Sequence, residues 1–108
     1  MRTWYCIGDK ESVPRQGARV VKTETLGDIA IFRTMDDQVH ALADRCPHRG
    51  GPLSPGIVHG GKVSCPLHNW SIDLSSGAVV GPDEGCVGRF ALKEEDGKLY
   101  LALSRDHG

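Results

Sequence analysis

Two short segments of the chain combine cysteine with histidine at close spacing. The first is Cys46-Pro47-His48 and the second is Cys65-Pro66-Leu67-His68. Thiolate sulfur and neutral imidazole nitrogen are both good ligands for iron and for zinc. Each segment therefore offers a metal centre one sulfur and one nitrogen.

The pairing of unlike ligands decides which centre is predicted. A mixed-ligand [2Fe-2S] cluster takes two cysteine sulfurs on one iron and two histidine nitrogens on the other. We therefore predict that Cys46, His48, Cys65 and His68 bind one [2Fe-2S] cluster per chain. A structural zinc site is the main alternative, although such sites usually group cysteine with cysteine and histidine with histidine. A zinc-held or metal-free interaction module thus stays open as a third class of function.

Residues next to the ligands suit a cofactor loop. Pro47 and Pro66 fix a backbone dihedral in each segment, which reduces the freedom lost when metal binds. Gly50 and Gly51 allow close approach of backbone N–H groups to sulfur. Two neutral imidazoles in place of thiolates leave a cluster less negative, so that it accepts an electron more easily. The segments therefore predict one-electron transfer, with no residues placed for catalysis.

The remaining cysteines and histidines have simpler interpretations. Cys6 lies in an apolar stretch, and we expect Cys6 and Cys86 to be buried thiols, because unligated cysteine often packs as a small hydrophobic residue. His40, His59 and His107 have no cysteine nearby in a matching pattern, and we expect ordinary side chains there.

The rest of the chain predicts an all-β fold. The segment from residue 46 to 61 is rich in Gly and Pro and poor in strand signal, which is typical of a loop structured by something other than its own core. Residues 9–13 could form a short helical turn. Apolar or alternating stretches predict strands at residues 3–7, 19–23, 28–33, 39–44, 62–64, 70–73, 89–94 and 98–103.

Length and charge exclude several classes. The chain has 108 residues without a break in composition, so we expect residues 1–108 to form one domain. The net charge is -1 and there is no Lys/Arg run, so nucleic acid is not an expected partner. Apolar runs stop far short of the roughly 20 residues that span a bilayer, so we expect no membrane contact. The start of the sequence leaves no room for a signal segment, so we expect a cytoplasmic location.

The two ligand boxes, Cys46-Pro47-His48-Arg49-Gly50-Gly51-Pro52-Leu53 and Cys65-Pro66-Leu67-His68, resemble those of the Rieske superfamily. The resemblance implies a fold of three small antiparallel sheets with an inserted cluster-binding subdomain from about Asp44 to Pro82. It also implies that Gly81-Pro82 belongs to a third loop that covers the cluster.

Within that superfamily, the segments 65–70 and 81–87 are most similar to the small subunit of assimilatory NAD(P)H nitrite reductase. This similarity implies an oxidoreductase role in nitrate assimilation, with a large catalytic subunit that carries flavin, sirohaem and a further iron-sulfur cluster and reduces nitrite to ammonium. The alternative is a Rieske ferredoxin that supplies electrons to an aromatic-ring dioxygenase. Both use the same ligands and differ in the partner, which is either the large subunit or an oxygenase or reductase protein.

Overall fold

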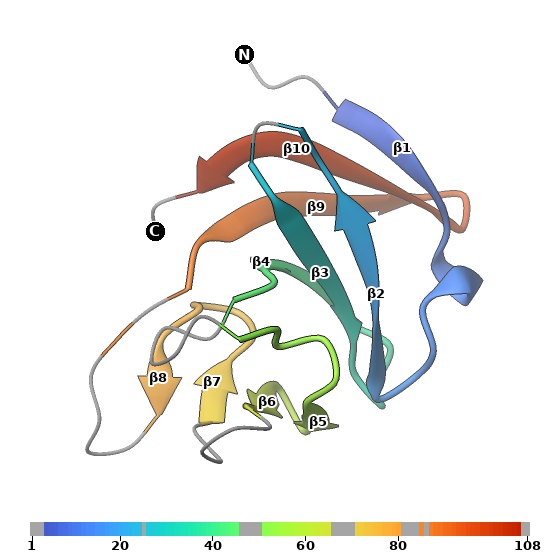
Figure 1. Ribbon diagram of the computed structural model, residues 1–108. Coiled ribbons are helices and arrows are strands. Elements are labelled where there is room, and N and C mark those ends of the chain that lie inside the picture. Colours follow the sequence, from blue (N-terminus) through green and yellow to red (C-terminus); the bar gives the residue numbers. More distant parts are fainter. Residues whose placement is uncertain are drawn as a thin grey trace.

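The computed structural model describes residues 4–24, 26–45, 51–65, 71–80, 85 and 87–106, without the side chains of 103–106. The described chain is built almost entirely from antiparallel strands, which confirms the predicted all-β class (Figure 1). The strands are β1 (Trp4–Asp9), β2 (Gly17–Lys22), β3 (Asp28–Arg33), β4 (Val39–Ala43), β5 (Ile57–His59), β6 (Lys62–Ser64), β7 (Ser71–Asp73), β8 (Val79–Val80), β9 (Arg89–Glu95) and β10 (Lys98–Asp106).

One helical segment interrupts the described strands. It is the 3-10 turn η1 (Lys10–Ser12), which lies inside the stretch where the sequence predicts a helical turn. No helix in the described part of the chain is long and apolar enough to cross a membrane.

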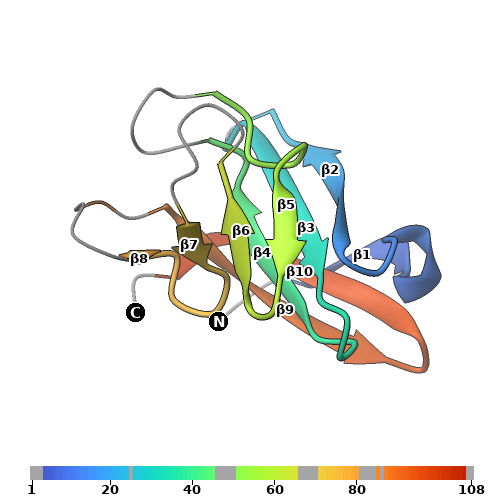
Figure 2. The ribbon, with the colours of Figure 1, turned by 90° about the horizontal axis from the view of Figure 1, so that it is seen from below.

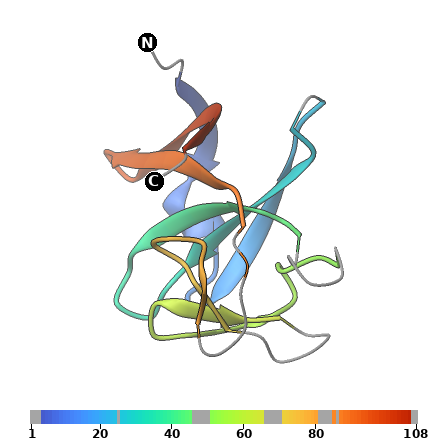
Figure 3. The same ribbon diagram turned by 90° about the vertical axis from the view of Figure 1, so that its left-hand side faces the viewer.

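Hydrogen-bonded ladders group the strands into two sheets. One has the order β1-β10-β9-β4-β3-β2 and the other has the order β5-β6-β7-β8. The first sheet depends on a short β4–β9 ladder with only two residue pairs, Ala41 with Phe90 and Leu42 with Arg89. On either side of this ladder the strands separate into different layers (Figure 3). The three small sheets implied by the resemblance correspond to these layers, two of which are joined through the β4–β9 ladder.

The middle layer, β2-β3-β4, is covered on both faces. Alternate side chains of β3 point in opposite directions, so Ala30 and Phe32 enter one hydrophobic core while Ile29 and Ile31 enter another. Sheet β5–β8 covers the first face, as Figure 2 shows from below. Strands β9 and β10 cover the second face. We call the two clusters the β5–β8 core and the β9–β10 core.

The strand predictions miss two short strands, β5 and β8. Strand β5 lies within the segment that the sequence marks as poor in strand signal. Both strands are defined by pairing with β6 and β7, which their own sequence pattern does not show. The expected burial of Cys6 is also wrong, because β1 lies at the edge of its sheet and exposes this side chain.

An ionic cluster fastens η1 to the β3–β4 turn. The Lys10 ammonium lies 2.9 Å from Asp37 Oδ2 and 2.8 Å from Glu94 Oε1. The Arg33 guanidinium lies 2.7 Å from Asp37 Oδ1 and 3.3 Å from Glu11 Oε1. Lys10 and Arg33 are only 8% and 3% exposed, so removing Asp37 would leave two buried cations short of counter-charge.

Replacing Asp37 by Asn should therefore destabilise the fold. Hydrogen bonds from Lys10 and then Arg33 lower the pKa of Asp37 from 3.8 to about 2. A lowered pKa contributes stability that is present above pH 3.8 and is lost as the pH falls toward 2. We expect Asp37→Asn to lower the melting temperature at neutral pH by several degrees and to flatten the loss of stability between these pH values. Thermal melts across this range test this, with the exposed turn residue Asp96→Asn as the control. Equal melting curves for Asp37→Asn and the wild type would contradict it.

Candidate metal centre

A single carboxylate joins the two ends of the first ligand loop, which comprises residues 44–54. Asp44 follows β4, and its Oδ1 accepts hydrogen bonds of 2.7 Å from the backbone N–H groups of both Leu53 and Ser54. Its Oδ2 accepts a 3.0 Å bond from the Ser54 hydroxyl. Asp44 itself is held by its N–H, which donates to the Asp28 carbonyl at 2.9 Å. The carboxylate therefore closes the segment between residues 44 and 54 into a loop.

Two of the predicted ligands, Cys46 and His48, fall within this loop in the sequence. Cys46 and His48 themselves lie outside the described residues, so their prediction as ligands remains a prediction.

The second ligand loop joins two paired strands. Ser64 at the end of β6 pairs with Ser71 at the start of β7, so their Cα atoms are about 5 Å apart. Residues 65–70 must leave and return across this short distance. Cys65 is the first residue of the loop, and His68 is three residues further along and outside the described residues.

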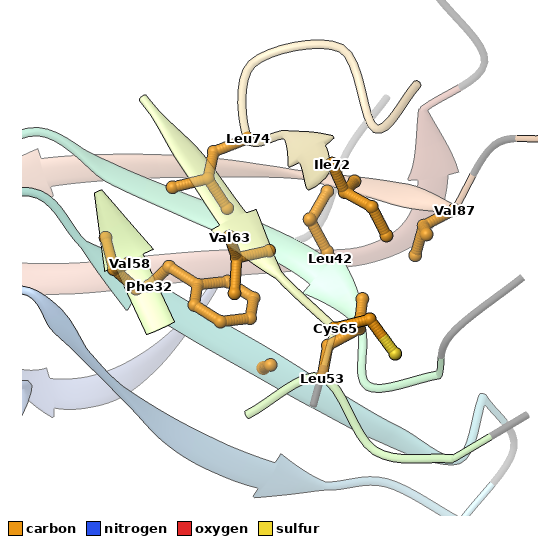
Figure 4. Packing of buried hydrophobic residues seen from close by; sticks show 10 residues of the cluster. Phe32, Leu42, Leu53, Val58, Val63, Cys65, Ile72, Leu74 and Val87 are labelled. Atoms are coloured by element: carbon orange, nitrogen blue, oxygen red, sulfur yellow. The ribbon is translucent and has the colours of Figure 1, made fainter. Parts of the chain in front are cut away.

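Cys65 is the one predicted ligand whose side chain is described. It is fully buried and belongs to the β5–β8 core together with Leu53. Its sulfur points away from Phe32 and Val63, out of the hydrophobic cluster (Figure 4). A buried sulfur at the edge of a hydrophobic core is shielded from water while facing outward, as a cluster ligand needs to be.

A close backbone contact brings the two loops together. Gly56 follows the first loop and donates its N–H to the Leu53 carbonyl at 2.8 Å. A Cβ at Gly56 would lie 2.3 Å from the Ser64 carbonyl oxygen and 2.9 Å from the Leu53 carbonyl oxygen. Both distances are shorter than any side chain allows, so glycine is required here. Ser64 immediately precedes Cys65, and this contact therefore sets the separation of the two ligand loops.

A third segment starts beside the second loop. Val80 at the end of β8 pairs with Ser71, the residue that follows the second loop. The Val79 N–H donates to the Gly85 carbonyl at 3.0 Å, and the Val87 N–H donates to the Gly77 carbonyl at 2.7 Å. These bonds hold the two ends of the segment that contains Gly81 and Pro82. Gly81 and Pro82 are themselves outside the described residues.

The described residues alone do not complete a metal site. They contain no group of three or more His, Cys, Asp or Glu that could hold a metal ion, since three of the four predicted ligands lie elsewhere in the chain. His40 is half-buried on β4, and the exposed His59 is hydrogen-bonded at 2.8 Å to Oγ of Ser64, the residue before Cys65. Cys86, which we expected to be a buried thiol, and His107, which we expected to be an ordinary side chain, lie outside the described residues.

Sequence reasoning missed both residues that position the loops. Asp44 carries a usable signal, because an aspartate before a Gly- and Pro-rich loop often binds backbone N–H groups. The signal at Gly56 is weaker. Pro55-Gly56 indicates a turn, but a turn signal does not say which distant backbone the glycine must approach.

A family model identifies the domain. A model of the Rieske [2Fe-2S] domain matches residues 3–91. The chain therefore belongs to the Rieske [2Fe-2S] domain family, and its cofactor is a [2Fe-2S] cluster. The described donor, Cys65, is a buried thiol at the start of the second ligand loop, which fits such a cofactor.

A curated relative contains a similar segment within a longer protein. The 4beta-methylsterol monooxygenase of Methylococcus capsulatus is 45% identical over 71 residues, which are 65% of this chain and 19% of that protein. This chain spans less than a third of the length of the first curated relatives that it matches.

Two solved structures share the fold over almost the whole chain. A chain from the complex of reduced oxygenase and oxidized ferredoxin in carbazole 1,9a-dioxygenase superposes with a TM-score of 0.87 at 22% identity, and the match covers 100% of both chains. A chain described as an NADH-dependent nitrite reductase small subunit from Mycobacterium tuberculosis gives 0.85 at 21% identity, covering 96% of this chain and 97% of that one. At these identities the likeness shows the fold.

Replacing Gly56 by Ala should separate the two loops. The added Cβ cannot lie 2.3 Å from the Ser64 oxygen, so the backbone must move, at a cost of about 1–3 kcal/mol. We expect a lower melting temperature and a smaller amount of iron and sulfide bound per chain. Gly61→Ala is the matched control, because a Cβ at Gly61 meets nothing within 4 Å. Normal cofactor content in Gly56→Ala would show that this contact does not set the loop separation.

Removing the Asp44 carboxylate should loosen the first loop. Asp44→Ala leaves two backbone N–H groups and one hydroxyl without their acceptor, and such losses cost roughly 1–3 kcal/mol. We expect faster loss of the cofactor to an iron chelator than in the wild type. Asp28→Ala is the control, because the Asp28 side chain is exposed and only its backbone carbonyl holds Asp44. Equal rates of cofactor loss in Asp44→Ala and Asp28→Ala would count against the role of Asp44.

Proposed function

We propose that this chain is an electron-transfer domain in which Cys46, His48, Cys65 and His68 bind one [2Fe-2S] cluster. The observation that carries the proposal is the contact of Gly56 with the Ser64 carbonyl, which brings the ends of the two ligand loops together. Each loop supplies one thiolate and one imidazole, the ligand set that a Rieske cluster uses. The cluster-binding subdomain is proposed to run from about residue 44 to 82 within one domain of residues 1–108.

When bound, the cluster supplies a centre that gains or loses one electron at a time. The chain holds that centre in place and limits its contact with water. Cys65 and Leu53 are fully buried at the edge of the β5–β8 core, and this apolar surrounding strengthens electrostatic interactions near the sulfur. Pro47 and Pro66 restrict the backbone in each ligand loop, which favours one arrangement of the donors.

The proposed electron acceptor is an oxygenase. The matched relative with 45% identity over 71 residues is a monooxygenase, and one structure with the same fold comes from an oxygenase–ferredoxin complex. A second candidate is the catalytic subunit of an NAD(P)H nitrite reductase that converts nitrite to ammonium. Segments 65–70 and 81–87 favour it through their resemblance to the small subunit of that enzyme. In both cases the domain transfers electrons and the partner carries out the reaction.

Metal analysis and electron paramagnetic resonance test the ligand assignment. We expect iron and acid-labile sulfide in equal amounts, and a reduced protein whose low average g value is typical of mixed histidine and cysteine ligation. His48→Ala and His68→Ala should abolish that signal because each removes one nitrogen ligand. Cys6→Ser should leave it unchanged, since Cys6 is exposed on the edge strand β1. Stoichiometric zinc without sulfide would overturn the proposal.

The partner is tested separately with the reduced protein. Rapid mixing with a Rieske oxygenase component should reoxidise the protein within the turnover time of the oxygenase. Copurification with a sirohaem protein, together with nitrite-dependent reoxidation, would instead support the nitrite reductase partner. Failure of both would leave the cluster assignment intact and would reject both proposed partners.

A further inference from the structure

The face of sheet β5–β8 that points away from the hydrophobic core carries an uncharged row of side chains. Cross-strand pairing places four residues next to one another in this row, one from each strand: Ile57, Ser64, Ser71 and Val80. Neighbouring strands are about 4.8 Å apart, so the four residues span roughly 14 Å. We call these four residues the outer row.

The outer row is exposed because the residues that alternate with it are buried. Val58, Val63 and Ile72 belong to the β5–β8 core, and successive side chains of a strand point to opposite faces. Strands β5 and β6 lie in front of β3 and β4 in Figure 2, and no described strand covers their outer face. Ile57 is 71% exposed and Val80 is 41% exposed. Each end of the row therefore presents an apolar side chain to the surroundings.

The other exposed large hydrophobic side chains in the described part of the chain belong to different elements. Tyr5 is 49% exposed on β1, and Met35 is 56% exposed in the β3–β4 turn. Single exposed hydrophobic residues are normal on a protein surface and need no explanation. Two in one uncharged row beside a cofactor loop instead indicate a contact surface.

The outer row is continuous with the second ligand loop. Ser64 is the residue before that loop and Ser71 is the residue after it. Ile57 follows Gly56, whose close approach to the Ser64 carbonyl brings the two ligand loops together. A protein that lies on the outer row therefore also reaches the residues on both sides of the second ligand loop.

Polar side chains border the row on the side away from the ligand loop. His59, Lys62 and Asp73 share the outer face, because each is two residues from a member of the row. The 2.8 Å hydrogen bond between His59 Nε2 and Ser64 Oγ joins the border to the row. Lys62 and Asp73 are paired across neighbouring strands, so their opposite charges lie next to each other. An uncharged centre with a polar border is typical of a protein–protein interface.

We propose that the outer row docks the oxygenase that accepts the electron, with Ile57 as the apolar anchor. This inference rests on the proposed function and adds the surface through which the domain meets its acceptor. The acceptor is a protein that must come close to the cluster, and the outer row is an exposed apolar surface that adjoins a ligand loop. The matching surface of the oxygenase should be uncharged, because a charge buried against the row would lose its water without gaining a partner.

The rate of electron transfer from the reduced, cluster-loaded protein to a Rieske oxygenase component tests the row. Ile57→Ser removes the apolar anchor at an exposed position, so it should raise the protein concentration that gives the half-maximal rate by about tenfold. The limiting rate, the midpoint potential and the electron paramagnetic resonance signal should be unchanged, because the variant alters docking and leaves the cluster as it is. Ile57→Val keeps most of the apolar surface and should raise the concentration by about threefold or less.

A second apolar residue provides the matched control. Met35→Ser removes a side chain of similar exposure at the other end of β4 from the first ligand loop, and it should leave transfer unchanged. Raising the salt concentration from about 0.05 to about 0.5 M should change the half-maximal concentration by less than about threefold, since the row has no charge to be screened.

Equal effects of Ile57→Ser and Met35→Ser, or a loss of about tenfold or more with salt, would overturn the proposal. Transfer that proceeds in the wild type and is not weakened by Ile57→Ser would reject the outer row alone. Cluster-loaded wild-type protein that transfers no electron to the oxygenase would reject the oxygenase partner and the outer row together.

Discussion

The candidate metal centre depends on one close backbone contact, that of Gly56 with the carbonyl of Ser64. The two ligand boxes are separated by many residues, and a binuclear cluster tolerates little variation in the spacing of its donors. The chain fixes that spacing through its own backbone, because nothing larger than a hydrogen atom fits between Gly56 and Ser64. Asp44 stabilises the first loop by accepting hydrogen bonds from the backbone N–H groups of Leu53 and Ser54. Contacts within the polypeptide therefore position the loop ends.

The layered fold supplies the rigid base for this contact. Strand β3 is buried on both faces, and β4 next to it leads directly to Asp44. The Ala43 N–H bonds to the Gly88 carbonyl at 2.8 Å, which ties the end of β4 to the segment that precedes β9. Cys65 and Leu53 extend the β5–β8 core to the base of both loops. A displacement of β4 would thus disturb the hydrophobic core and the ligand loops together.

The sequence predicts well whatever depends on local pattern. Strand β3 and strand β6 have the predicted bounds, because their alternating or apolar residues are bordered by clear turn signals. The Cys-His pairs indicate the cofactor for the same reason, since ligand types and spacing are local features. Strand β5, strand β8 and the exposure of Cys6 depend on which strands become neighbours or edges, and local pattern does not contain that information. The need for glycine at position 56 is also absent from local pattern, because it comes from the Ser64 carbonyl in another strand.

The carboxylates before and after strand β4 have different roles in this fold. At its start, the β3–β4 turn presents Asp37 to the buried cations Lys10 and Arg33. At its end, Asp44 binds uncharged N–H and hydroxyl groups of the first ligand loop. The five residues of β4 place these ends roughly 16 Å apart, so the ionic cluster lies at the far end of the strand from the loop. The ion pairs that stabilise the fold therefore lie at the opposite end of β4 from the first ligand loop, which the Asp44 carboxylate closes.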